Sequence, residues 1–100
     1  MNILIRKQLI LKLAKKLAIS YTENLSYMNC KTIAKELDCD TNTIARLAAI
    51  PNFKATQSLK PDLEQKIATF LGYKNYYDLE INLMMQVVFD KLKILLHTEK

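Results

Sequence analysis

Four polar residues stand close together near the middle of the chain: Thr41, Asn42, Thr43 and Arg46. Their side chains form directed hydrogen bonds. The amide of Asn42 carries both donors and an acceptor, and the guanidinium of Arg46 is a planar fork of donors. No acidic residue occurs between positions 41 and 50. This stretch therefore combines hydrogen-bonding groups with a positive charge and no carboxylate.

The residue constellations that enzymes use are missing from the sequence. There is one glycine in 100 residues, so no glycine-rich phosphate loop can form. Cys30 and Cys39 are the two cysteines, and with the single histidine, His97, they cannot complete a tetrahedral zinc site. We interpret both cysteines as reduced packing residues and His97 as a solvated residue at a helix end. We expect no enzymatic activity, no cofactor, no metal and no small-molecule substrate.

Two short helices are predicted to position the polar stretch. Asn29 is expected to cap the first helix, which runs to about Leu37, and Asp40 to cap the second, which runs from Thr41 to about Ile50. Each helix has one apolar stripe, formed by Ile33, Ala34 and Leu37 in the first and by Ile44, Leu47 and Ala48 in the second. The outward residues of the second helix are then Thr41, Asn42, Thr43, Ala45, Arg46 and Ala49.

The spacing of this helix pair resembles the helix-turn-helix of Cro- and lambda-repressor-type DNA-binding proteins, over about positions 30–50. The matching positions are Ile33, Ala34, Leu37, Cys39, Ile44 and Leu47. Two positions depart from the family pattern, because Asp38 stands where the turn usually has Gly and Cys30 where the first helix often opens with Gln. Asp can adopt the left-handed backbone of the turn at some cost relative to Gly.

The resemblance implies a small, repressor-like transcriptional regulator, phage-like in type, whose second helix enters the major groove of double-stranded DNA. The implied base contacts are made by Thr41, Asn42, Thr43 and Arg46, with Asn42 suited to adenine and Arg46 to guanine or a phosphate. The implied phosphate contacts are made by Lys31 and Lys35 on the first helix and by Lys54 and Gln57 in the loop after the second.

Composition predicts a single all-α domain over residues 1–100. Half of the residues are hydrophobic, a quarter are charged, and one Gly and two Pro leave long stretches without helix breakers. Polar residues interrupt every apolar run, so no segment is expected to cross a membrane. The first residues lack the features of a secretory signal, and we expect a cytoplasmic protein.

Net charge is +5, but it is unevenly placed. Residues 1–20 contain five basic residues and no acid, whereas residues 21–50 contain three basic and four acidic residues. The helix pair itself is therefore not basic, which weakens the electrostatic argument for DNA binding because phosphate contacts supply much of the affinity.

The flanking segments predict three further helices, five in all. The first, from about Leu4 to Ile19, has a broad apolar arc that needs either a deep position in the core or a partner. Another begins with Pro61 in its first turn and ends at Gly72 in a left-handed cap.

The last and longest helix is amphipathic and covers about residues 76–97. It has an apolar seam with 4-3-4-3 spacing, formed by Ile81, Met85, Val88, Leu92 and Leu95. We predict a homodimer through this seam, with two recognition helices about one DNA turn apart. The alternative is that the first helix covers the seam within one chain.

Two functions remain open at this stage. One is sequence-specific DNA binding through residues 41–50. The other is a protein–protein interaction module, such as an antirepressor or accessory subunit, in which the helix pair is only a scaffold.

Overall fold

The structure, a computed structural model, describes residues 2–20, 25–55 and 58–98. Within these ranges the secondary structure is entirely helical. The elements are α1 (Ile3–Lys16), α2 (Tyr27–Leu37), α3 (Thr41–Ala48), α4 (Pro61–Phe70) and α5 (Tyr76–Thr98). The predicted fold class, five helices ending in a long C-terminal helix, is confirmed. No helix among the described residues combines the length and the apolar character needed to cross a membrane.

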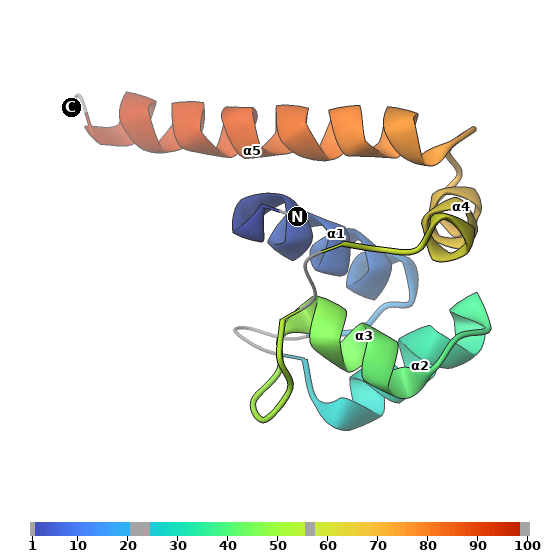
Figure 1. Cartoon of the computed structure of the whole chain (residues 1–100). Coiled ribbons are helices and arrows are strands. Elements are labelled where there is room, and N and C mark those ends of the chain that lie inside the picture. The colour runs from blue at the N-terminus through green and yellow to red at the C-terminus, as the bar shows by residue number, and fades with distance from the viewer. Residues whose placement is uncertain (1, 21–24, 56–57, 99–100) are drawn as a thin grey trace.

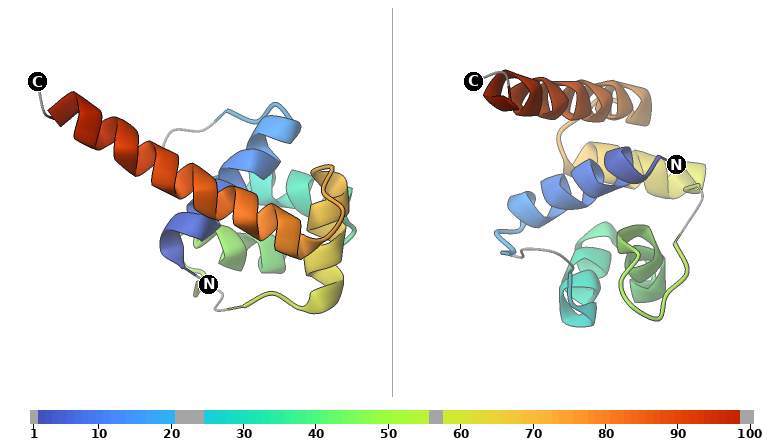
Figure 2. Two further views of the ribbon diagram at one scale, coloured as in Figure 1. Left: turned by 90° about the horizontal axis from the view of Figure 1, so that it is seen from above. Right: turned by 90° about the vertical axis from the view of Figure 1, so that its left-hand side faces the viewer.

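Three layers make up the molecule. Figure 1 shows α5 along one side, α1 in the middle and the α2–α3 pair on the other side, and the right view of Figure 2 shows the same order. α1 contacts both α3 and α5, while α4 contacts α2 and α5. Because α1 is packed on two sides, its broad apolar arc is used inside the fold, and Leu9 and Leu13 are completely buried.

Side-chain caps begin four of the helices, including α5, where Asn75 Oδ1 accepts a hydrogen bond from the Asp78 N–H at 2.9 Å. Asn2 Oδ1 accepts a hydrogen bond from the Leu4 N–H at 2.7 Å, and Asp40 Oδ1 accepts one from the Asn42 N–H at 3.3 Å, as predicted for Asp40. The predicted cap of α2 is wrong. Ser26 Oγ caps α2 by accepting from the Asn29 N–H at 3.1 Å, so α2 begins at Tyr27 and Asn29 lies within its first turn.

The first four helices end in the same way, with one residue in the left-handed region. These residues are Ala18, Asp38, Ala49 and Gly72, with φ of 56°, 53°, 53° and 86°. In each case the next N–H bonds back to an alanine carbonyl five residues earlier, as in Cys39 to Ala34 (3.0 Å) and Ile50 to Ala45 (3.2 Å). This is the Schellman motif, which satisfies carbonyls that the last turn leaves unpaired.

These caps explain where the predicted boundaries differ. α1 ends at Lys16 instead of Ile19 because Ala18 is left-handed. α3 ends at Ala48 instead of Ile50 because Ala49 is left-handed, two residues before Pro51 could act. The left-handed conformations expected for Asp38 and Gly72 are confirmed.

Candidate nucleic-acid interface

α3 presents a narrow polar face to solvent. Asn42 and Arg46 are exposed, and Thr41 and Thr43 are half-buried. The opposite side holds Ile44 and Leu47, which are completely buried and fix the rotation of the helix about its axis. The exposed face of α3 is therefore centred on Asn42 and Arg46.

Ala45 does not belong to this face. It was predicted to point outward, but its exposed fraction is 0%. α3 contacts α1 as well as α2, so its buried arc is wider than one stripe, and a small side chain is needed there. Ala49, also predicted to be outward, is half-buried.

Tyr27, at the start of α2, is tied to the polar face. Its hydroxyl donates a hydrogen bond to Asn42 Oδ1 at 3.0 Å. Its ring stacks on Phe53 with centroids 5.8 Å apart and planes 22° apart. The amide of Asn42 is thereby oriented, because the oxygen is directed at Tyr27 and the NH₂ donors point away from it. The oxygen keeps a second lone pair, so a further donor can still reach it.

No sequence signal marked Tyr27 for this position. Tyr27 and Asn42 are 15 positions apart and lie on different helices, so no local pattern joins them. Phe53 is half-buried and packs against the core as well as stacking on Tyr27.

Arg46 and Thr43 border a pocket of about 390 Å³ between α3 and the start of α4. Three of its lining residues are cationic, Arg46, Lys60 and Lys66, and one, Asp62, is anionic. Lys60 and Lys66 were not predicted to lie near the exposed face of α3. The positive charge beside Arg46 is therefore greater than the composition of residues 21–50 implies.

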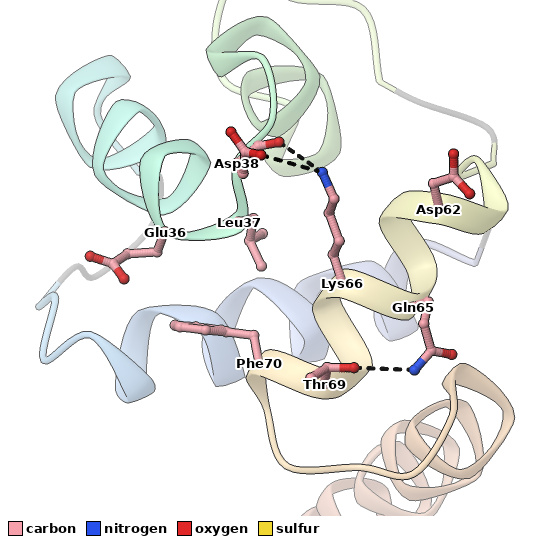
Figure 3. Close-up of a pocket in the computed structure, with 8 residues that line it drawn as sticks. All are labelled: Glu36, Leu37, Asp38, Asp62, Gln65, Lys66, Thr69 and Phe70. Atoms are coloured by element: carbon pink, nitrogen blue, oxygen red, sulfur yellow. Dashed lines mark hydrogen bonds and ion pairs between the residues drawn. The ribbon is translucent and has the colours of Figure 1, made fainter.

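Lys66 also connects α4 to the turn between α2 and α3. Its Nζ donates to the Asp38 carbonyl oxygen at 2.9 Å and lies 4.0 Å from the Asp38 carboxylate. Figure 3 shows Lys66 reaching across a second, wider pocket of about 660 Å³ toward Asp38. That pocket also contains Glu36 and Asp62, so its acidic character makes it unsuitable for nucleic acid.

Three of the four residues predicted to contact phosphates lie within the described part of the chain. Lys31 and Lys35 are exposed on α2, and Lys54 is exposed in the loop after α3. Gln57 lies outside the described residues.

Both cysteines are free thiols. Burial raises the pKa of Cys30, which is completely buried. Burial also raises the pKa of Cys39, where Lys66 acts in the opposite direction and Asp40 and Asp38 add to the increase. Among the described residues, no group of three or more His, Cys, Asp or Glu side chains is placed to hold a metal ion.

The predicted dimer seam on α5 lies open. Ile81, Met85, Val88, Leu92 and Leu95 are all 40–58% exposed. The alternative that α1 covers this seam is wrong, since α1 packs on the other side of α5, where Leu79 and Leu83 are completely buried. Gln8 Nε2 on α1 donates to Asp90 Oδ2 at 2.8 Å on that inner side.

Comparisons of the chain with protein-family models, curated proteins and solved structures find no match.

Proposed function

We propose that this chain is a sequence-specific DNA-binding transcriptional regulator whose α3 enters the major groove. The observation that carries this proposal is the joint placement of Asn42 and Arg46 on the exposed face of α3, with Tyr27 orienting the Asn42 amide. A helix of eight residues is about 12 Å long, and the major groove is about 12 Å wide, so α3 suits end-on or oblique insertion.

Asn42 and Arg46 are the proposed base-reading residues. The Asn42 donors suit N7 of adenine, while its oxygen can also accept from the adenine amino group. Arg46 suits guanine or a phosphate. Thr41 and Thr43 are half-buried, so we assign them phosphate or thymine-methyl contacts. Lys31, Lys35 and Lys54 supply the surrounding phosphate contacts, and Lys60 and Lys66 add positive charge beside Arg46.

Selection of bound sequences from random duplexes, using the purified chain, tests this proposal. An enriched motif is expected, with affinity that falls steeply as salt rises because phosphate contacts release counterions. Arg46→Ala should weaken binding to the selected site by about 1–3 kcal/mol and relax preference at one base pair.

Lys35→Ala should weaken all duplexes to a similar extent, because phosphate contacts carry no sequence information. Lys74→Ala is the matched control, since Lys74 is also exposed but lies in the link between α4 and α5. Failure of the wild-type chain to bind any duplex would remove DNA binding as the function.

The second candidate is a protein–protein interaction module, favoured by the uncovered apolar face of α5. Docking of a partner on that face would respond little to salt, whereas DNA binding must weaken as salt rises. Under the DNA-binding proposal the same face serves a homodimer.

A further inference from the structure

The outer face of α5 is an unusually large uncovered apolar surface for a chain of this size. Eight large hydrophobic residues on this face, between positions 81 and 96, are 40–66% exposed. They are Ile81, Met84, Met85, Val88, Phe89, Leu92, Leu95 and Leu96. At about 100° per residue, Ile81, Val88 and Leu92 lie roughly 180° around the helix from the buried Leu79 and Leu83. α5 therefore has the rest of its own chain on one side and no cover on the other.

The C-terminal end of α5 also extends past the rest of the molecule, as Figures 1 and 2 show. Every residue from 91 to 97 is exposed, including Leu92, Leu95 and Leu96. Most helical stability in proteins comes from burying an apolar face, and contiguous exposed apolar surface marks an interaction site. An extended apolar helix end therefore requires a partner.

We propose that a second copy of this chain covers this face, with the two α5 helices packed antiparallel about a centre near Gln86. With roughly 150–250 Å² for each fully exposed large side chain, the eight residues present on the order of 800 Å² per copy. A standard stable interface uses about 800 Å² per partner, so this face alone is large enough for a dimer.

The charges at the edges of the face select the antiparallel order. Glu80 and Lys91 lie on one edge by helical spacing, Asp78 and Lys93 lie toward the other, and all four are exposed. In an antiparallel pair, Glu80 faces Lys91 of the second copy and Asp78 faces Lys93 of the second copy. A parallel pair brings Glu80 near the second Asp78 and Lys91 near the second Lys93, which places like charges together.

The apolar residues agree with the same register. Both charge pairs have their midpoint between residues 85 and 86. Pairing Ile81 with Leu92, and Met85 with Val88, has its midpoint between residues 86 and 87, only about 1.5 Å further along the axis. The same register lays the extended end, at Leu95 and Leu96, over Tyr77 of the second copy, and Tyr77 is 70% exposed.

This dimer changes the expected mode of DNA binding. The helices α3 and α5 lie on opposite sides of α1, so two copies joined through the outer face of α5 hold their α3 helices at opposite ends of the dimer (Figures 1 and 2). The sequence-based expectation of two recognition helices one turn apart on one palindrome does not fit this arrangement. If the proposed function holds, one dimer binds two separate duplex segments.

Solution mass in the absence of DNA tests the dimer independently of DNA binding. Light scattering of the full chain should give twice 11.6 kDa at micromolar concentration. Met85→Glu should give a monomer with unchanged helical circular dichroism, because Met85 is 52% exposed and outside the core. Met28→Glu is the matched control, since Met28 is 67% exposed on α2 and should leave the dimer intact. A monomeric wild-type chain, or a Met85→Glu dimer, would overturn the proposal.

Charge reversal tests the helix order. Lys91→Glu with Lys93→Glu should weaken the homodimer by about 10- to 100-fold, as should Asp78→Lys with Glu80→Lys. Mixing the two variants should restore a heterodimer of wild-type affinity. In a parallel pair the first variant only exchanges one like-charge contact for another, so an unchanged homodimer would refute the antiparallel order.

Titration with a short selected duplex then tests the DNA arrangement. A complex of one dimer with two duplexes is expected, and a complex of one dimer with one duplex would refute this placement of the α3 helices. The absence of any complex would count against DNA binding and leave the α5 dimer standing.

Discussion

Removing the Tyr27 hydroxyl is the most direct perturbation of the proposed recognition face. Tyr27→Phe keeps the ring that stacks on Phe53 and deletes only the donor to Asn42 Oδ1. This hydrogen bond joins neutral groups at an exposed site, so its loss should lower the free energy of unfolding by no more than about 0.5–1 kcal/mol. Without it, the two orientations of the Asn42 amide become nearly equal in energy.

Equal orientations mean that half of the molecules present the wrong edge to the base. Presenting the wrong edge half of the time weakens binding to the preferred base by about 0.4 kcal/mol (RT ln 2). The Asn42 side chain is also no longer held in one rotamer, which raises the total loss of binding free energy to about 0.5–1 kcal/mol. Tyr27→Phe should therefore reduce base preference at one position about two- to fivefold. Asn42→Ala should remove that preference entirely, which is a loss of about 1–3 kcal/mol.

The assay is competition binding against four duplexes that differ only at the base pair assigned to Asn42. The double variant Tyr27→Phe with Asn42→Ala should match Asn42→Ala alone, because Tyr27 acts only through Asn42. An unchanged preference in Tyr27→Phe, or an additional loss in the double variant, would refute this role for the hydroxyl. Stacking on Phe53 would then be the function of Tyr27.

Three further outcomes are expected from the caps and the buried hydroxyl. Gly72→Ala should lower the free energy of unfolding by about 1 kcal/mol, and Tm by about 4–8 °C in thermal melting, because Gly72 has a φ of +86°. An added Cβ meets no atom within 4 Å, so the whole cost comes from the backbone conformation. Ala49→Gly, at φ 53°, should raise Tm by a smaller amount, and a fall would mean that the cap geometry is different. Tyr76→Phe should stabilise the fold by about 1 kcal/mol at neutral pH, because the buried hydroxyl has no hydrogen-bond partner among the described residues. Burial, with Glu64 and Glu80 adding, raises the pKa of Tyr76 to about 12. Wild-type stability should therefore fall between pH 10 and 12, as the unfolded phenol ionises first, and denaturant melts of Tyr76→Phe should show less of this loss.

Local sequence determined the helices and most of their ends. The cap at Asp40, the left-handed turn at Asp38 and the stop at Gly72 depend on residues within one or two turns, where side-chain and backbone chemistry act directly. The apolar seam of α5 followed from helical periodicity alone, because that period is a property of one helix. Where this local logic failed at the start of α2, Ser26 and Asn29 are two residues of similar capping propensity only three positions apart.

Only the tertiary structure decided which residues meet. The Tyr27–Asn42 hydrogen bond spans 15 residues, and the Lys66–Asp38 contact spans 28. The burial of Ala45 depends on α1 approaching α3, which no periodicity within α3 reports. The placement of α3 and α5 on opposite sides of the molecule likewise depends on α1 lying between them. Periodicity specifies the faces of each helix, but the packing of helices from distant parts of the chain sets their directions relative to each other.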